Sequence, residues 1–501
     1  MKNTLLIALV IWASSCTSTK KNNTNNQTSM STQNTTTQSK SFYDFSIATL
    51  DENGAINMTD YKGKKILFVN VASECGFTPQ YKDLQELHKT YGEKLVVIGG
   101  GAAGFFCAVN AARLHPGLQV LLVEKSNKLL AKVKVSGGGR CNTTHACFEL
   151  PELVQKYPRG QNFLKKTFHW FNTNDTIEWF AARGVALHTE ADGRMFPTTN
   201  NSQTIIDCLL KEADKYKVQV QLQTGVEKIT SKDVGGFVIV TDKENIDANY
   251  VCLATGGFPK AAQFDIVTNT GHTIETPVPS LFTFNMPGNP ITELMGVSVP
   301  EAHVKISGTK ISASGPLLIT HWGMSGPAIL KCSAWGAREL ANMGYQFTIR
   351  VNWIPTYAEQ DLRTAWPLIR AEQGNTKMGG RNPFELPSRL WLHLLAVSGI
   401  DAGASWATLT SGSQNKLIIA LTGFECKVAG KTTFKEEFVT CGGVKLSEID
   451  ANTMQSKLHK GLYFAGEIMD IDGITGGFNF QNAWTSGWIA AKSIADAAKI
   501  V

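Results

Sequence analysis

The chain has 501 residues, 43% hydrophobic and 18% charged, a composition typical of a soluble globular protein with room for roughly two to four domains. Its 48 basic and 42 acidic residues give a formal net charge of +6 and form no basic cluster interleaved with aromatic residues, so no nucleic-acid partner is expected. Ten cysteines occur without a Cys-x-x-Cys pair, which argues against a zinc ribbon and a vicinal redox disulfide, and no metal site is predicted.

Residues 1–16 have the pattern of an export signal, with Lys2 at the start, an apolar core over residues 5–12 and a small-residue end Ala-Ser-Ser-Cys16. The last four residues resemble a bacterial lipobox, in which the cysteine carries the lipid; an ordinary cleaved signal is the alternative. The signal predicts a membrane-anchored lipoprotein or a periplasmic protein. Residues 17–40 are rich in Asn, Thr, Ser and Gln and are expected to form a disordered tether.

Residues 41–94 form a separate segment, with a hairpin predicted around Asn53-Gly54, a buried strand over residues 66–72 and a helix over residues 79–91. The run Asn-Val-Ala-Ser-Glu-Cys75-Gly-Phe-Thr-Pro-Gln-Tyr, which joins strand to helix, resembles the active-site signature of the glutathione peroxidase family. The resemblance implies part of a thioredoxin-like fold. It also implies a peroxidatic thiolate at Cys75, with its pKa lowered by the helix start that follows.

The resemblance to peroxidases stops at the glycines near residue 99, and the family's activating glutamine, tryptophan-asparagine pair and later strands are absent. Cys75 is therefore predicted to be vestigial, because an isolated catalytic group loses most of its power. The strand over residues 66–71 has no expected place beside the next strand, because a first Rossmann strand already has two neighbours. We interpret the junction as a gene fusion or deletion.

A β-branched run over residues 94–98 ends in Gly99-x-Gly101-x-x-Gly104, and an amphipathic helix is predicted over residues 103–114. The glycines suit a tight turn, close approach of backbone to a pyrophosphate, and close packing of helix on strand. A second apolar run over residues 119–123 ends in Glu124, where dinucleotide folds hold ribose hydroxyls. This combination predicts a Rossmann dinucleotide site.

Further along, the run Ser136-Gly-Gly-Gly-Arg140-Cys141-Asn142 offers N–H groups and a cation that suit a diphosphate, with a flexible loop as the alternative. For Cys141, structural burial is favoured over a redox relay because no resolving cysteine stands at Cys-x-x-Cys spacing. Helices are predicted over residues 170–183 and 202–216, strands over residues 218–222, 237–241 and 250–254, and a turn at Thr255-Gly256.

Residues 461–479 repeat the order strand, acid, glycine turn, and a helix is predicted over residues 481–497. Glu467 is expected to hold a ribityl hydroxyl. The N-terminus of the helix is expected to face the N1–C2 carbonyl edge of a flavin, where charge gathers on reduction.

Residues 99–501 resemble the bacterial FAD-dependent oxidoreductases of the aminoacetone oxidase and 3-dehydro-bile-acid reductase-like family. The resemblance rests on the motifs at residues 99–104, 136–142, 320–327 and 465–479. It implies an α/β fold, a Rossmann-type FAD-binding domain with a large inserted domain of β-rich and helical parts. In the inserted domain we expect strands over residues 304–306, 347–351 and 416–421 and helices over residues 357–372 and 387–397.

The expected domains are a signal (1–16), a tether (17–40), a partial peroxidase-like fragment (41–94), the FAD-binding domain (95–270 and 439–501) and the inserted domain (271–438). Motifs and resemblance together predict these cofactor-binding residues: Gly99, Gly101, Ala103, Gly104, Glu124, Lys125, Lys132, Gly138, Arg140, Cys141, Asn142, Val226, Thr255, Gly256, Gly466, Glu467, Asp470, Gly473, Gly476, Gly477, Phe478 and Asn479.

The predicted function is hydride transfer between FAD and a small organic substrate, an amine or an enone, or NAD(P)H as a transient reductant. No second Gly-x-Gly-x-x-Gly follows another strand, so no dedicated nicotinamide domain is expected. His321 is the predicted acid or base on the substrate side, and a capping or core histidine is the alternative. Two other functions stay open: a thiol peroxidase through Cys75, and a non-catalytic flavoprotein partner in RNA modification or structure. The family resemblance alone would suggest a cytoplasmic protein.

Overall fold

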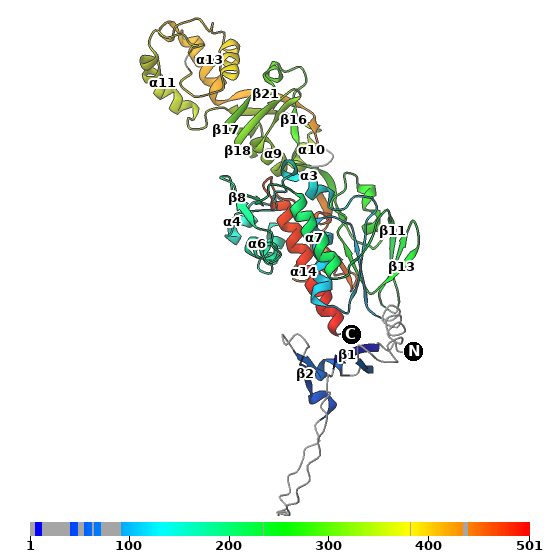
Figure 1. Cartoon of the computed structure of the whole chain (residues 1–501). Coiled ribbons are helices and arrows are strands. Elements are labelled where there is room, and N and C mark those ends of the chain that lie inside the picture. The colour runs from blue at the N-terminus through cyan, green and yellow to red at the C-terminus, as the bar shows by residue number, and fades with distance from the viewer. Residues whose placement is uncertain are drawn as a thin grey trace, which may run out of the picture. The chain divides into compact units, whose positions relative to one another are not determined.

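The computed structural model describes residues 6–12, 41–48, 55–62, 65–71, 92–233, 235–380, 382–433 and 439–500. The chain divides into two compact units (Figure 1). The first contains residues 1–94, 115–119 and 495–501, and the second contains residues 95–114 and 120–494. Each unit is described by itself.

The first unit holds short strands. β2 (Ser46–Ala48) and β3 (Ala55–Asn57) pair antiparallel, which confirms the predicted hairpin, and η1 (Phe42–Asp44) and η2 (Met58–Tyr61) flank it. β4 (Lys65–Val71) confirms the predicted strand and pairs in parallel with β1 (Leu6–Trp12), the apolar core of the predicted signal. Cys16, the tether, Cys75 and the helix predicted over residues 79–91 lie outside the described residues.

The central sheet of the second unit has the strand order β10-β6-β5-β14-β24. β5 (Lys94–Ile98) lies between β6 (Gln119–Val123) and β14 (Tyr250–Leu253), and β10 (Gln219–Gln221) and β24 (Leu462–Phe464) form the edges. β14 pairs in parallel with β5 and β24. Since both sides of β5 are occupied, β4 has no place beside it, as predicted, and β4 belongs to another sheet.

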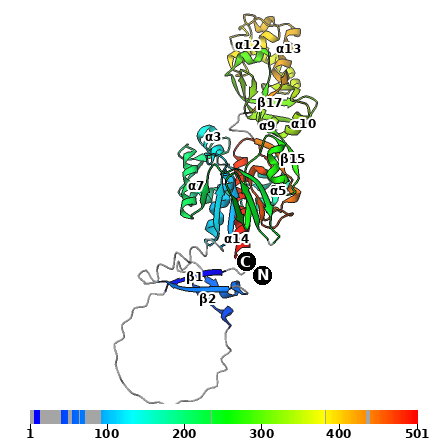
Figure 2. The same ribbon diagram turned by 90° about the vertical axis from the view of Figure 1, so that its right-hand side faces the viewer.

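Helices and two small sheets complete this domain (Figure 2). α2 (Ala102–Leu114) confirms the predicted helix, but residues 103–112 are all buried, so the prediction that it is amphipathic was wrong. The last helix of the domain is α14 (Phe478–Ile500). One three-stranded sheet has the strand order β7-β9-β8 and contains Arg194, the first residue of β9. The other has the order β11-β12-β13, and Val226 is the first residue of β11. The bounds are α3 (Ala131–Gly139), β7 (Thr144–His145), α4 (Leu150–Val154), α5 (Gln161–Thr167), α6 (Thr173–Ala181), β8 (Leu187–Thr189), β9 (Arg194–Pro197), α7 (Gln203–Lys215), β11 (Val226–Ser231), β12 (Phe237–Thr241), β13 (Asn245–Ala248), η3 (Ala261–Phe264) and α8 (Asp265–Thr268).

The antiparallel pair β15 (Ile274–Ser280) and β23 (Val439–Val444) leads into and out of the inserted domain. That domain has a seven-stranded sheet, β21-β20-β17-β18-β19-β16-β22, and a set of helices. Figures 1 and 2 both show α9 and α10 next to the domain of the central sheet and α13 at the opposite end. The bounds are β16 (Thr283–Asn285), η4 (Pro290–Leu294), β17 (Ser298–Ile306), β18 (Ser312–Thr320), β19 (Gly323–Ser325), α9 (Pro327–Trp335), α10 (Ala337–Asn342), β20 (Gln346–Asn352), α11 (Glu359–Gln373), α12 (Ser388–Val397), η5 (Trp406–Thr408), α13 (Ser411–Thr422), β21 (Phe424–Ala429) and β22 (Lys431–Thr432).

One element of the inserted domain was predicted wrongly. Residues 416–421 read as a strand because they form a short apolar run, but they lie in helix α13. The hydroxyl of Thr410 caps that helix by accepting the N–H of Ser413, and Leu417, Ile418 and Leu421 are buried. Tertiary packing of one helical face thus outweighs the local preference of β-branched residues for strands.

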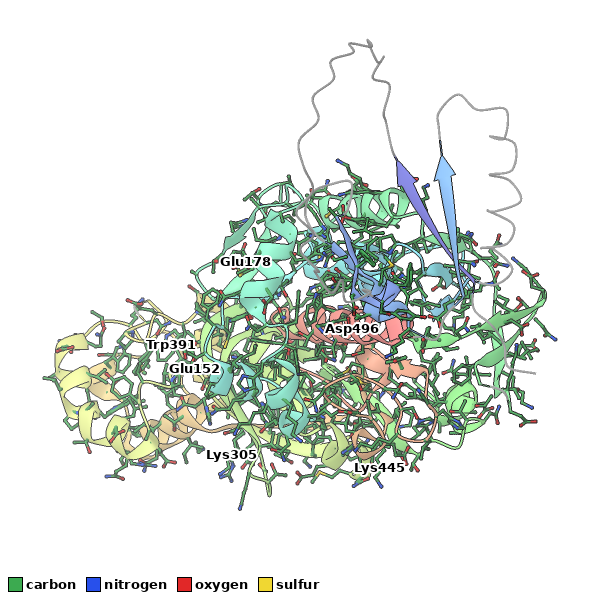
Figure 3. The ribbon with its side chains drawn as sticks, turned by 90° about the horizontal axis from the view of Figure 1, so that it is seen from below. Glu152, Glu178, Lys305, Trp391, Lys445 and Asp496 are labelled. Carbon is green, nitrogen blue, oxygen red and sulfur yellow. The ribbon has the colours of Figure 1, made fainter. Side chains whose placement is uncertain are left out.

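A continuous apolar core fills the inserted domain, with Trp353, Trp366, Trp391 and Trp406 almost fully buried. Trp391, labelled in Figure 3, lies on helix α12 and stacks on Trp406 with ring centroids 6.1 Å apart. Its indole N–H donates to the carbonyl oxygen of Met378. The part of the chain that the structure describes contains no helix long and apolar enough to cross a membrane.

Candidate functional site

The turn after β5 has the geometry that a bound pyrophosphate needs. Gly99 has φ +114°, and a Cβ there would overlap the carbonyl oxygen of Ala254, whereas a Cβ on Gly104 would overlap that of Gly99. Both positions therefore require glycine. A Cβ on Gly101, by contrast, would meet nothing within 4 Å. This glycine keeps space open at the N-terminus of α2, where backbone N–H groups attract an anion.

Glu124, at the end of β6, is fixed by the backbone on both sides. Its Oε2 accepts the N–H of Gly100 at 2.8 Å, and its Oε1 accepts the N–H of Ser126 at 2.8 Å. A carboxylate has about four acceptor positions, so capacity for ribose hydroxyls is left. The side chain is thus oriented in advance for the role that the sequence predicts.

Glu467 lies opposite, in the short helix η7 (Gly466–Ile468). Its Oε2 forms an ion pair with Nζ of Lys132 at 2.6 Å, and its Oε1 accepts the N–H of Thr440 at 2.8 Å. These contacts connect α3, strand β23 and the C-terminal segment that contains Glu467. Lys132 and Glu467 are both predicted cofactor residues, and the fold brings them together from positions 335 residues apart.

The peptide between Gly476 and Gly477 is held at both ends. Nδ1 of His145 lies 2.9 Å from the carbonyl oxygen of Gly476, and Nδ1 carries the proton because a carbonyl only accepts. The amide of Asn142, oriented to satisfy both its ends, accepts the N–H of Gly477 at 3.0 Å. Burial lowers the pKa of His145, which favours the neutral ring stacked on Phe478. The glycine loop before α14 is therefore fixed by β7 and the residues just before it.

Asp470 and Asp472 point away from the cavity, toward arginines. Arg338 binds both carboxylate oxygens of Asp470 at 2.8 Å. Arg159 forms an ion pair with Asp472, which is fully buried, and also donates to the carbonyl oxygen of Ala334. Burial raises the pKa of Asp472, and the charge of Arg159 opposes that shift. Asp470, predicted to bind cofactor, instead ties the C-terminal segment to the inserted domain.

A cavity of about 500 Å³ opens between the N-termini of α2 and α14, within the size range of cofactor sites. It gathers predicted residues from four separate motifs, which confirms that the motifs share one place in the fold. The predicted residues that line it are Gly99, Gly101, Ala103, Glu124, Lys132, Asn142, Thr255, Gly256, Gly466, Glu467, Gly476, Gly477 and Asn479.

Other predicted residues lie behind this lining. Arg140 forms an ion pair with Glu190 at 2.6 Å and covers the ring of Phe196, so a carboxylate of the protein already neutralises its charge. Burial raises the pKa of Cys141 to about 11, as expected of a structural thiol. The remaining predicted residues outside the lining are Gly104, packed on Gly99; Lys125, over the ring of Phe258; Gly138, in the kink of α3; Val226, which begins β11; Gly473, bonded to Asn479; and Phe478.

His321 does not line the cavity. It is exposed at the turn between β18 and β19, beside the ring of Trp322. Its motif reaches the cavity farther on, at Ser325, and Leu330, in the helix that follows the motif, also lines the cavity. Sequence reasoning missed these two residues and also Ser126, Lys128, Arg194 and Thr283. Ser126 and Lys128 had a local signal, their position directly after Glu124, and Ser325 had another, its position in the motif at residues 320–327.

These features fit FAD. The open space at Gly101, the pre-oriented Glu124 and the two helix N-termini are the donor set that a dinucleotide with a flavin ring requires. Residues 93–493 match the HI0933-like protein Rossmann domain family. The chain belongs to this family. The HI0933-like family consists of FAD-dependent oxidoreductases, and FAD is the cofactor of this chain.

Two relatives matched over nearly their whole length support the assignment to the HI0933-like family. The chain is 31% identical over 410 residues to the ribosomal RNA dihydrouridine synthase of Escherichia coli, covering 80% of this chain and 97% of the relative. It is 27% identical over 422 residues to the 3-dehydro-bile acid delta(4,6)-reductase of Clostridium scindens, covering 80% and 99%. A solved 3-ketosteroid delta1-dehydrogenase from Sterolibacterium denitrificans aligns with a TM-score of 0.44 at 15% identity, over 80% of this chain and 99% of that one.

The N-terminal segment matches a second family, glutathione peroxidase, over residues 42–139. The chain is 46% identical over 59 residues to the glutathione peroxidase of Lactococcus lactis, covering 12% of this chain and 37% of that relative. The peroxidase-like portion is therefore a short fragment. The two family matches overlap over residues 93–139, and in the structure those residues belong to the Rossmann strands β5 and β6 and the segments around them.

Proposed function

We propose that this chain is a reductase of a carbon–carbon double bond conjugated with a carbonyl group. The observation that carries the proposal is the full-length match to two relatives whose names describe one chemistry. A 3-dehydro-bile acid delta(4,6)-reductase saturates double bonds conjugated with a ketone. A dihydrouridine synthase saturates the double bond that is conjugated with a carbonyl of uracil. Of the two predicted substrate types, this favours the enone over the amine.

The reaction balances with NAD(P)H as the reductant. The carbon β to the carbonyl takes a hydride, the electron pair moves to the carbonyl oxygen, and water supplies the proton at the α carbon. FAD supplies the hydride relay between the two substrates when it is bound. The overall change is one enone, one NAD(P)H and one proton to one saturated ketone and one NAD(P)⁺.

The chain's own residues would bind and orient the cofactor. Glu124 and the turn at Gly101 would hold the adenosine and pyrophosphate end, and Lys132 and Glu467 would hold the ribityl chain. The N-terminus of α14, with the Gly476–Gly477 peptide fixed by His145 and Asn142, would offer partial positive charge to a bound flavin. The inserted domain contributes neutral residues to the lining of the same cavity, Leu281, Thr283, Ser325, Leu330 and Thr433.

The test is a two-step assay on the purified full chain. The protein should be yellow with the absorption bands of oxidised flavin, NADH or NADPH should bleach those bands, and 2-cyclohexen-1-one or an RNA that contains uridine should restore them. Product analysis should show a saturated carbon–carbon bond. A protein whose reduced flavin is reoxidised by oxygen alone, and by no conjugated carbonyl compound, would contradict the proposal.

A further inference from the structure

The cavity has two chemically different halves. All its charged lining residues come from the FAD-binding domain: Glu124, Lys128, Lys132, Arg194 and Glu467. The inserted domain contributes only neutral side chains, as far as the described residues extend: Leu281, Thr283, Ser325, Leu330 and Thr433. The first half fits a charged dinucleotide. The second half therefore belongs to the substrate.

The neutral half has an apolar wall. Leu281 and Leu330 line the same cavity as Ile471 and Ile474 of the C-terminal segment. The two acids on either side of Ile471 are bound by arginines, because Arg159 pairs with Asp472 and Arg338 pairs with Asp470. A charged substrate group placed here would lose its hydration without gaining a partner, at a cost of several kcal/mol. The wall thus selects an uncharged molecule.

Two hydroxyl groups in this half, those of Ser325 and Thr433, make no hydrogen bond to any residue that the structure describes, and Ser325 is the one that lies on a strand. Thr283 lies across from Ser325 by the register of β16 and β19, in which Phe284 pairs with Met324. The hydroxyl of Thr283 already donates to the carbonyl oxygen of Thr432 and accepts the indole N–H of Trp322, both at 3.2 Å. The hydroxyl of Ser325 makes no hydrogen bond to any residue that the structure describes, and it is half-buried at the cavity.

The backbone around Ser325 fixes where that hydroxyl lies. Met324 is fully buried in the core on one face of β19, so Ser325 faces the opposite side, toward the cavity. Its backbone pairs with Leu318 on β18. Gly326, with φ +94°, then turns the chain into α9, and a Cβ there would come within 2.8 Å of the carbonyl oxygen of Pro316. A residue held in this way can donate one directed hydrogen bond.

We propose that Ser325 donates a hydrogen bond to the carbonyl oxygen of an uncharged, flat ring compound with a conjugated double bond. This inference rests on the proposed function and assigns the substrate half of the same cavity. As the electron pair moves onto the carbonyl oxygen, the hydrogen bond from Ser325 strengthens, so the residue acts in the reduction of substrate and not in the oxidation of NAD(P)H. The ring is either a free cyclic enone or a uracil base of an RNA.

The experiment separates the two half-reactions in Ser325→Ala, Ser325→Thr and the matched control Ser312→Ala, an exposed serine on the same sheet. Flavin reduction by NADPH should stay within twofold of wild type in all three. Reoxidation by 2-cyclohexen-1-one, or by an unmodified ribosomal RNA transcript, should slow about 10- to 100-fold in Ser325→Ala and recover in Ser325→Thr. The control should behave like wild type.

Binding gives a readout without turnover. The dissociation constant of p-chlorophenol, an uncharged mimic of the enol, should rise about tenfold in Ser325→Ala and stay unchanged in Ser312→Ala. A wild-type protein that reduces neither ring probe would overturn the proposed function itself. A wild-type protein that reduces a probe while Ser325→Ala matches it in rate and binding would overturn this inference alone.

Two further arms test the substrate class. Reduction of 3-oxocyclohexene-1-carboxylate as fast as 2-cyclohexen-1-one would overturn the assignment of an uncharged substrate. Turnover of the transcript but not of the free enone, with the Ser325→Ala defect, supports a uracil base as the source of the ring. The reverse result supports a free enone.

Discussion

β4 (Lys65–Val71) and β5 (Lys94–Ile98) are both apolar strands that lead into a sequence matching an enzyme's active site, yet they have different surroundings. β5 lies inside a five-stranded sheet, and the loop after it packs against Ala254 and Glu124 from neighbouring strands. β4 pairs with β1 in a two-stranded sheet. A catalytic loop is held in position by the strands that pair with its own strand on both sides. In the matches to two peroxidase relatives, the fragment that carries Cys75 covers only 37% and 36% of the relative's length.

The largest expected effect tests how firmly the flavoprotein domain is held together. Arg159→Met should lower the free energy of unfolding by about 3–5 kcal/mol, because it leaves the fully buried Asp472 without its ion-pair partner. Arg363→Met, at an exposed ion pair with Glu359, should cost only about 0.3–0.5 kcal/mol. Urea unfolding of the FAD-loaded full chain measures both. Equal losses would show that the buried pair does not stabilise the domain.

The second effect concerns the turn after β5 alone. Gly101→Val should fold normally, because its Cβ meets nothing within 4 Å, but should retain FAD at least about 100-fold more weakly, since the side chain occupies the pyrophosphate space. Gly412→Val, in α13, is matched because its Cβ also meets open space. FAD content after dialysis is the measurement. A fully loaded Gly101→Val protein would mean that the glycine motif has been misread.

The third effect is smaller and lies on the next strand. Glu124→Ala should weaken FAD binding by about 1–3 kcal/mol, because it removes a charged hydrogen-bond acceptor for the ribose. It also frees the N–H groups of Gly100 and Ser126. Glu124→Gln keeps one acceptor oxygen and should lie between alanine and wild type. Isothermal titration of the FAD-free protein distinguishes them, and unchanged binding in Glu124→Ala would contradict the ribose role.

The fourth effect is a pH dependence that belongs to the flavoprotein domain. His272 is buried, its Nδ1 and Nε2 are bound to Thr270 and Ser456, and burial lowers its pKa, with Glu448 opposing and His459 reinforcing the shift. A depressed folded-state pKa means that stability is full above the ordinary histidine pKa near 6.5 and falls as pH drops through the folded value. The melting temperature should therefore decline between pH 7.5 and 5.5. His272→Gln should flatten that decline, and an unchanged slope would assign it to other groups.

Most of the cofactor half of the site could be predicted from the sequence, but little of the substrate half could. Gly99, Glu124 and Glu467 follow apolar strands, and the carboxyl ends of parallel strands meet at one edge, so their convergence was predictable. Ser325 and Thr283 meet through a strand register that no local pattern specifies. Asp470 and Arg140 were assigned to the cofactor by motif, but partners 132 and 50 residues away bind them. Residues 416–421 were predicted as a strand, but packing against residues distant in the sequence stabilises them as part of helix α13.

The smallest expected effect is that of deleting the N-terminal segment, which tests directly whether the flavoprotein domain depends on it. A truncation is best made just before Gly92, because the carbonyl oxygen of the buried Glu93 accepts the N–H of Gln119 at 2.9 Å. A chain that begins at Gly92 keeps that contact, β5 and its turn. It should remain soluble and FAD-loaded, with unfolding free energy within about 1 kcal/mol of the full chain, the size of one hydrogen bond.

Cys75→Ser in the full chain should leave flavin reduction and peroxide consumption unchanged, since the fragment lacks the groups that activate a peroxidatic thiol. The truncated protein should also keep the pH dependence assigned to His272, because all of its partners lie beyond Gly92. A truncated protein that precipitates or loses FAD would show that the fragment stabilises the flavoprotein domain. A peroxidase activity that disappears with Cys75→Ser would show that the fragment is a second active site, and the two regions would then be alike in function although they differ in structure.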